Sequence, residues 1–385
     1  MRPLEGRRLW FVGIGGAGMS AYARIASAWG AEVGGWDRVE TMYLEALRGN
    51  ELVIAPEPVV REGWEVVVSS AYASVSGKSR AEFLAELVSL RDAVVVAGAH
   101  GKTTTTGMIA YVLSQLGRDP AFAIGGHIPQ LGGNAGTGAG WFVVEGDESD
   151  RTIAALRPRV AVVLNVELDH HTEFASAAEL EAAFERWLSG VRHVVRDAPA
   201  YEGPLVLPGE HNRRNAGAAI AALELVGLPR AEAEGPLAAF TGTGRRFEVH
   251  ETGTRTIVDD YAHHPAEISA TIAATRERWP DATVRVLFQP HLFSRTRHLA
   301  WALAEALAAA DDVTVTDVYA AREQPVPGVT GKLVVDALSD RGVLAGWTPT
   351  VEQGAARLQR RSRDGDVLLV LGAGDVDRAV GLLGG

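Results

Sequence analysis

The sequence contains no cysteine, which excludes disulfide bonds and metal sites built from thiolates. Lysine is almost absent as well, because Lys78, Lys102 and Lys332 are the only lysines among 37 basic residues. No apolar run reaches the roughly 18 residues of a membrane span, and the first segment has no apolar stretch of the signal-peptide type. These absences predict a soluble protein of the cytoplasm.

The charge balance points away from nucleic acids and membranes as partners. The net charge is −11 at pH 7, and an acidic chain has no general attraction for polyanions. Local charge still decides whether an anionic small molecule binds. The 385 residues are enough for two or three domains. The oligomeric state stays open, and a homodimer is one of the alternatives.

Short apolar runs alternate with helical patterns along the whole chain. This alternation is typical of parallel βαβ units, so we expect an α/β fold. Segment 132–140, GGNAGTGAG, is expected to be a loop. Domain boundaries are predicted near 88 and 242, which gives domains 1–88, 89–242 and 243–385. The expected strands include 7–15, 92–98, 141–146 and 365–375, and the expected helices include 17–30, 80–90 and 210–227.

A dinucleotide fingerprint lies between the first strand and the first helix. Its glycines are Gly13, Gly15, Gly16 and Gly18, and Asp37 follows about 20 residues later. Glycines at these positions let backbone N–H groups approach a pyrophosphate at a helix N-terminus. The pattern alone indicates NAD or FAD and does not distinguish them from a UDP-sugar. A tight turn without a ligand is the other interpretation.

A second glycine-rich loop, AGAHGKTTTT, also joins a strand to a helix. Gly98 and Gly101 enclose only two residues before Lys102 and Thr103, whereas the common phosphate loop has four. A shorter loop can still direct N–H groups at phosphates, with the lysine on the β/γ-phosphates and the threonine on Mg²⁺. A lysine kept here, in a chain that otherwise uses arginine, favours this interpretation over a glycine-rich turn.

Carboxylates and histidines follow the later strands. Glu145 opens EGDESD, and His170 and His171 close NVELDHH. Beside a phosphate loop such carboxylates suit Mg²⁺, although a solvated acidic turn and a structural histidine remain alternatives. In the last third, DDYAHHP and QPHLFSRTR also lie at strand ends. Their arginines can clamp carboxylates or phosphates and their histidines can relay protons, unless both are merely exposed loops.

Taken together and in order, these motifs resemble those of the Mur ligase family, from about residue 8 to about residue 376. The longest matching segments are GIGGAGMSAYA, AGAHGKTTTT, VVEGDESD, NVELDHH, GEHNRRNA, GTGRRFE, DDYAHHPAEI, FQPHLFSRTR, DVYAAREQPVPG and LGAGD. The resemblance implies three domains: a Rossmann-like domain, a central P-loop ATPase domain and a Rossmann-like C-terminal α/β domain. It further implies that ATP and Mg²⁺ drive ligation of L-alanine to the carboxylate of UDP-N-acetylmuramate for peptidoglycan precursor synthesis.

The resemblance also assigns site residues. Lys102, His263 and Arg295 would be catalytic. The ATP site would comprise Gly98, Ala99, His100, Gly101, Lys102, Thr103, Thr104, Asn212, Asn215, Arg246 (or its neighbour Arg245) and Asp260. The UDP-sugar would contact Gly13, Gly15, Gly16, Gly18, Asp37, Ser69 and Ser70. The amino acid would contact Tyr261, His263 and Arg295. Thr103 and Glu145 would hold one Mg²⁺, and His170 would hold a second.

Two departures from the family pattern stand out. The chain is shorter than usual for the family, and Leu292 follows QPH, where many members have an arginine. Three other functions stay open from the residues: a sibling ligase that adds a whole peptide to the same nucleotide sugar, a nicotinamide-dependent dehydrogenase, and a non-catalytic nucleotide-binding regulator. The dehydrogenase leaves GKTTTT and EGDESD unexplained, and the motif residues Lys102, Thr103, Glu145 and His170 argue against the regulator.

Overall fold

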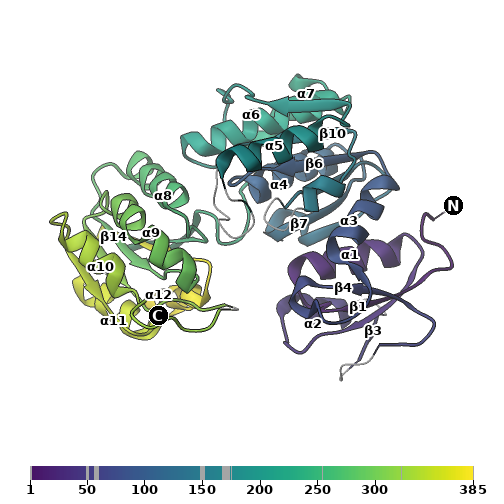
Figure 1. The fold of residues 1–385 in the computed structure, drawn as a ribbon. Coiled ribbons are helices and arrows are strands. Elements are labelled where there is room, and N and C mark those ends of the chain that lie inside the picture. The colour runs from purple at the N-terminus through teal and green to yellow at the C-terminus, as the bar shows by residue number, and fades with distance from the viewer. Residues whose placement is uncertain are drawn as a thin grey trace. The chain divides into compact units, whose positions relative to one another are not determined.

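The computed structural model describes residues 2–48, 52–55, 60–147, 152–166, 174, 176–253, 255–321 and 323–384. The chain divides into two compact units, drawn from purple to yellow along the chain in Figure 1. The first unit comprises 1–206 and 212–243, and the second comprises 207–211 and 244–385. The predicted boundary at 88 lies inside the first unit, and the three-domain division at 88 and 242 remains a prediction.

The first sheet of the first unit is entirely parallel. Its strand order is β3-β2-β1-β4-β5, so β1 lies at the centre, as in a Rossmann-like half. The carboxyl ends of β1, β2 and β4 therefore lie along one edge, where ligands bind in such sheets. The bounds are β1 Arg8–Val12, α1 Ala17–Ala28, β2 Glu32–Trp36, α2 Met42–Arg48, β3 Val53–Ile54, β4 Glu65–Val68, β5 Lys78–Ser79 and α3 Arg80–Ser89.

The central sheet has the order β11-β10-β6-β9-β7-β8, and only the pair β7–β8 is antiparallel. All five residues of β6 are buried, which is why this strand is a continuous apolar run. The bounds are β6 Ala93–Ala97, α4 Lys102–Gln115, β7 Ala121–Ile128, β8 Gly133–Thr137, β9 Phe142–Glu145, β10 Val160–Val163, α5 Ala177–Leu188, β11 His193–Arg196, α6 Glu210–Leu225 and α7 Arg230–Ala238.

The expectation of a loop at 132–140 was wrong for its first half, because residues 133–137 form β8. Local propensity indicated a loop, since glycine weakens strands, but pairing with β7 overrides it. The Phe122 ring on β7 lies against Gly136, where a Cβ atom would be 2.2 Å from a ring carbon. Glycine therefore serves this edge strand by admitting the neighbouring ring.

The two sheets of the first unit share one hydrophobic core. It runs from Leu9 and Phe11 on β1, through α1 and α3, to Val95 and Val144 of the central sheet. The Trp29 ring meets the Phe142 ring edge-on at 5.7 Å. This continuous core binds the Rossmann-like half to the central sheet.

The sheet of the second unit has the order β12-β13-β17-β14-β15-β16, and all of its pairs are parallel except β12–β13. Successive side chains of β17 point to opposite faces of the sheet. Leu369 packs in the core with α8, α9 and α10, and Leu368 packs in the core with α11 and α12. The bounds are β12 Glu248–Thr252, β13 Arg255–Asp260, α8 Pro265–Arg278, β14 Val284–Phe288, α9 Phe293–Leu307, β15 Asp312–Val315, α10 Lys332–Ser339, β16 Ala345–Trp347, α11 Val351–Arg361, β17 Val367–Leu371 and α12 Arg378–Gly384.

The predicted α/β class is confirmed by these three sheets with helices between their strands. Within the described part of the chain, none of the helices combines the length and the apolar character needed to span a bilayer.

Candidate active site

The predicted phosphate loop, residues 98–101, joins β6 to the N-terminus of α4. Gly98 and Gly101 have φ angles of +137° and +82°, a region that favours glycine. A Cβ atom on Gly101 would also lie 2.4 Å from the Asn215 amide oxygen. The ammonium of Lys102 donates to the carbonyl of Gly98 and lies 3.4 Å from that of Ala99. The loop thus brings a helix N-terminus and an ammonium together, which is the combination that binds phosphate.

Asn165, which the sequence analysis did not select, holds this loop in place. Its side-chain oxygen accepts from the backbone N–H of His100 at 2.8 Å, and its amide donates back to the His100 carbonyl at 3.1 Å. Asn165 opens NVELDHH just after β10, so the position of the motif at a strand end was the available signal. Three predicted ATP-site residues are buried: Thr104 lies on α4, and Asn212 and Asn215 lie on α6.

Glu145, at the end of β9, meets the start of α4. Its carboxylate accepts from the Thr103 hydroxyl at 3.2 Å and from the Gly125 N–H at 2.6 Å. Burial raises the pKa of Glu145, and the nearby Lys102 acts against that rise. A divalent cation would offset the cost of this buried negative charge, and hydroxyl and carboxylate oxygens are the donors that Mg²⁺ prefers. His170, the predicted ligand of a second Mg²⁺, lies outside the described residues.

The fingerprint glycines lie between β1 and α1, as predicted. Gly13 has φ +84°, and a Cβ atom there would lie 2.7 Å from Ser69. Asp37 accepts from the Gly15 N–H at 2.8 Å and from the Tyr72 hydroxyl at 3.0 Å. The acidic residue therefore helps to hold the glycine loop. Two other predicted UDP-sugar contacts lie at the start of α1: Gly16 caps the helix and Gly18 is in its first turn. After β4, Ser69 caps a short 3-10 turn and Ser70 is exposed.

His263, which precedes α8 in the second unit, has a defined tautomer. Its Nδ1 lies 3.0 Å from the carbonyl of Tyr261, and a carbonyl only accepts hydrogen bonds. Nδ1 therefore carries the proton and Nε2 keeps a free lone pair in the neutral ring. Burial lowers the pKa of His263; the Glu267 carboxylate opposes that fall and Arg295 adds to it. The arrangement suits a proton acceptor near neutral pH.

Four rings line up at the carboxyl ends of β13, β14 and β15. This ring row consists of Tyr261, His263, His291 and Tyr319, with successive centroid distances of 5.4, 5.7 and 5.8 Å. Arg295 lies at the row, with its guanidinium 3.4 Å from Nδ1 of His291. Tyr261 and His263 were predicted as site residues. His291 and Tyr319 lie in the motifs QPHLFSRTR and DVYAAREQPVPG but were given no individual role.

The two arginines before β12 take different positions. Both guanidinium groups lie 5.4 Å from the centre of the Tyr261 ring. Arg245 donates to the carbonyls of Gly372 and Gly374 at 2.7 and 3.0 Å, so it is held by the loop after β17. Arg246 instead meets the carboxylate of Glu267 at 3.2 Å.

Asp260, a predicted ATP contact, lies inside the second unit. It is 6% exposed, and it accepts from the N–H groups of Phe247 and Ala262 and from the Thr271 hydroxyl. These bonds join the end of β13 to the segment before β12 and to α8. Its contact with ATP stays a prediction.

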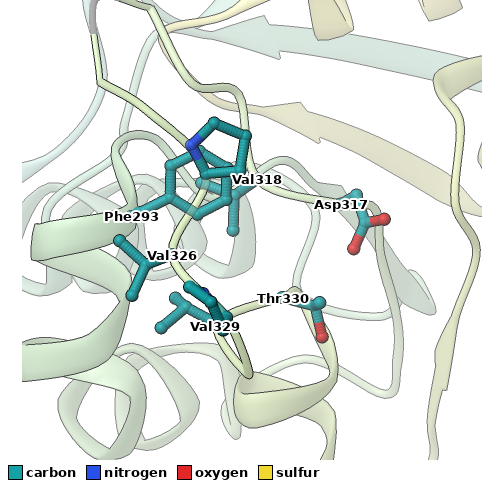
Figure 2. A pocket seen from close by; sticks show the side chains of 8 residues that line it. Phe293, Asp317, Val318, Val326, Val329 and Thr330 are labelled. Atoms are coloured by element: carbon teal, nitrogen blue, oxygen red, sulfur yellow. The ribbon is translucent and has the colours of Figure 1, made fainter.

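A pocket of about 380 Å³ opens at the carboxyl end of β15. Figure 2 shows Phe293, Val326 and Val329 around it. Its remaining lining includes one carboxylate, that of Asp317, and one hydroxyl, that of Thr330. Asp317 also accepts from the indole N–H of Trp347 at 3.1 Å. This lining suits an apolar group better than a phosphate.

Two protein-family models match parts of this chain. A model described as the Mur ligase middle domain matches residues 96–200, and one described as the Mur ligase, glutamate ligase domain, matches residues 245–374. A UDP-N-acetylmuramate–L-alanine ligase from Streptomyces avermitilis is 38% identical, with 97% of this chain and 96% of the relative covered. That alignment spans 448 residues against 385 here, so the relative has segments that this chain lacks.

Solved structures show the same likeness. A UDP-N-acetylmuramate–alanine ligase from Thermotoga maritima matches with a TM-score of 0.80 and 27% identity, covering 98% of both chains. A murein peptide ligase from Psychrobacter arcticus matches with a TM-score of 0.67 and 21% identity over 98% of both chains, which shows a shared fold. With a relative 38% identical over nearly its whole length, this chain belongs to the Mur ligase family.

Proposed function

We propose that this chain is an ATP-dependent ligase that joins L-alanine to the carboxylate of UDP-N-acetylmuramate through an acyl phosphate. The observation that carries the proposal is the similarity to alanine-adding ligases, at 38% identity over 97% of this chain. The phosphate loop with Lys102, Thr103 and Glu145 supplies the chemistry that such a reaction needs. The product would serve peptidoglycan precursor synthesis in the cytoplasm, where ATP and nucleotide sugars are formed.

In the first step, an oxygen of the muramyl carboxylate attacks the γ-phosphorus of ATP. The bond from that phosphorus to the leaving oxygen breaks, and ADP departs with the electron pair. Protein catalysis of phosphoryl transfer is mainly positioning and charge neutralisation. Lys102 and the N-terminus of α4 supply positive charge at the phosphate loop. Arg246 is a predicted ATP contact.

In the second step, the neutral amine of alanine attacks the acyl carbon. The C–N bond forms, the bond to the phosphate oxygen breaks, and phosphate leaves with the electron pair. The amine must lose a proton, and Nε2 of His263 is our candidate acceptor because Nδ1 donates to the Tyr261 carbonyl. Arg295 would hold the alanine carboxylate by a charge-assisted hydrogen bond, with Tyr261 beside it.

Thr103 and Glu145 fit a magnesium ion, since their oxygens lie 3.2 Å apart next to the phosphate loop. His170 is the predicted ligand of a second Mg²⁺. When bound there, Mg²⁺ would neutralise charge on the β- and γ-phosphates. The role of this chain's own residues is to keep two oxygen donors beside Lys102 and to hold Gly125 against Glu145.

We assign the first fingerprint to the UDP pyrophosphate, with ATP supplying the driving force in place of a hydride carrier. Asp37 already accepts from Gly15 and Tyr72, which favours a role in holding the loop over one in binding the ribose of NAD. The predicted contacts from Ser69 and Ser70 would lie at the same edge, after β4. Calorimetry tests the assignment: binding of NAD without binding of the UDP-sugar would overturn it.

The function is tested by incubating the purified chain with ATP, Mg²⁺, UDP-N-acetylmuramate and single amino acids. Phosphate release and product mass are both measured. We expect L-alanine to be the best amine, with glycine and L-serine slower, because one methyl group contributes only about 1–3 kcal/mol to discrimination. Ligation of an L-alanyl-γ-D-glutamyl tripeptide without ligation of alanine would identify the peptide-adding sibling instead.

A further inference from the structure

The Glu267 carboxylate contacts a predicted ATP contact, Arg246, and a predicted catalytic residue, His263. It is the third residue of α8. One carboxylate oxygen lies 3.2 Å from the Arg246 guanidinium. The other accepts from the backbone N–H of His263 at 3.1 Å and lies 3.4 Å from Nδ1 of the same residue. That oxygen also accepts from the His264 N–H at 3.3 Å.

The carboxylate therefore touches one predicted participant in each reaction step. Arg246 is the predicted ATP contact of this unit, and His263 is the proposed acceptor for the amine proton. The side chain of Glu267 is only 11% exposed, so its charge is weakly screened by solvent. A shift of either partner relative to the other would require this carboxylate to move.

We propose that Glu267 is a positioning residue that holds Arg246 and His263 in a fixed relation, so that one carboxylate serves both the phosphoryl-transfer step and the amine-attack step. The inference rests on the proposed ligase function. A carboxylate here orients the His263 ring from the Nδ1 side, which leaves Nε2 for the substrate. The same group holds the Arg246 guanidinium against the face of Tyr261.

A purely structural role is the competing explanation, because glutamate at the third position often caps a helix. Glutamine performs that capping role as well. Glu267→Gln therefore keeps the shape and the acceptor for the two backbone N–H groups, and it removes the charge and the oxygen that accepts from Arg246. If helix capping is the whole role of Glu267, this substitution should preserve both the stability of the chain and its catalytic rate.

The charges around His263 set the expected pH effect. Glu267 faces it from α8, Arg295 from α9 and Arg246 from the segment before β12, while the rings of Tyr261 and His291 flank it. Among these groups Glu267 favours the imidazolium form. Its neutralisation should therefore lower the pKa of His263 further and move the acid limb of the kcat/KM profile to lower pH.

The experiment compares wild type, Glu267→Gln and the control Glu277→Gln, which changes an exposed glutamate on the same helix. Product formation with L-alanine is measured across pH. Acyl phosphate is trapped separately with hydroxylamine, an amine that is largely unprotonated at neutral pH and needs little help from a base. We expect kcat to fall about tenfold or more in Glu267→Gln, trapping to slow as well, and the control to match wild type.

The outcomes separate cleanly. A Glu267→Gln variant with wild-type kcat and an unmoved acid limb would overturn the inference, and so would a loss confined to one of the two steps. If that variant does not fold, Glu267→Asp is measured in its place. Aspartate keeps the charge but is one methylene shorter, so its carboxylate lies farther from His263 and both steps should slow. Wild-type rates in Glu267→Asp would overturn the inference. A wild-type chain that forms no alanine product would instead refute the proposed function.

Discussion

The phosphate loop of the first unit and the ring row of the second unit are built from different parts of the chain. The loop uses backbone groups of four consecutive residues, 98–101, and one lysine that follows directly. The ring row collects side chains from three separate strand ends, and its outer rings, Tyr261 and Tyr319, are each 37% exposed. A backbone site needs glycines in a set order, whereas a side-chain site needs only the strands to end together.

The largest expected effect is the loss of Lys102. Lys102→Ala should lower kcat about a thousandfold without unfolding the chain, because a preorganised cation at a developing phosphate charge contributes several kcal/mol. The check is single-turnover formation of ADP, with circular dichroism as the measure of folding. Turnover within a few-fold of wild type would mean that the loop is a glycine-rich turn and that its contrast with the ring row is mistaken.

Removal of the Glu145 carboxylate should come next in size. Glu145→Ala should depress turnover roughly a hundredfold, since a lost metal contact costs several kcal/mol of charge stabilisation, and it should raise the Mg²⁺ concentration needed for half-maximal rate. The matched control is Glu145→Gln, which keeps an acceptor for Gly125. If the glutamine variant needs no more Mg²⁺ than wild type, Glu145 serves only to hold the Gly125 backbone.

The contrast also explains what could be predicted from the sequence. The α/β class, the phosphate loop and its helix followed from contiguous patterns, because strand, glycines and helix start are adjacent in the chain. Asn165 was missed although it braces the same loop, since it reaches His100 across 65 positions. No local pattern carries such a pairing; only the parallel neighbours β6 and β10 bring it about.

In the second unit the sequence placed Tyr261, His263 and Arg295 at strand ends and missed their partners. His291 and Tyr319 become neighbours because β14 pairs with β15, a pairing that local periodicity does not specify. The strand β8 was missed for the same reason, since its five residues are ordered by β7. Tertiary pairing, and not propensity, decided these positions.

A buried carboxylate in the second unit should make stability depend on pH. Asp259 is 4% exposed, and burial raises its pKa from 3.8 to about 7, despite Arg245 at 3.3 Å. The folded state therefore binds more protons than the unfolded state between about pH 4 and pH 7, so the free energy of unfolding falls as pH rises through this window. At about 1.4 kcal/mol per pKa unit, the cost above pH 7 is at most about 4 kcal/mol.

Asp259→Asn removes this penalty while keeping the shape of the side chain. The difference in Tm between the variant and wild type should grow in favour of the variant from pH 5 to pH 8. Asp281→Asn, at an exposed position before β14, is the control and should show no such trend. A difference in Tm that is constant across pH would mean that Asp259 stays ionised in the folded chain and that the second unit carries this buried charge without cost.

The smallest effect is expected at Leu292, where the ring row lacks an arginine that the family often has. Leu292 has φ +69°, held by its N–H on the Tyr319 carbonyl and by its own carbonyl, which accepts from Thr296. This strained backbone disfavours any residue with a Cβ atom. Leucine and arginine share that cost, so Leu292→Arg adds a guanidinium three residues before Arg295 with little change in backbone strain.

A second guanidinium beside Arg295 should share the carboxylate of alanine. A net charge-assisted bond contributes about 1.5–3 kcal/mol when well formed, so at this partly exposed position KM for alanine should fall roughly fivefold to tenfold. The reacting atoms lie elsewhere on the substrate, so kcat should change less than twofold. Leu292→Met, which alters the side chain without adding charge, is the control and should keep the wild-type KM. The measurement is initial rate against alanine concentration at saturating ATP and UDP-N-acetylmuramate. An unchanged KM in Leu292→Arg would show that alanine is held elsewhere, and the ring row would then lose its assignment as the amino-acid site while the phosphate loop kept its own.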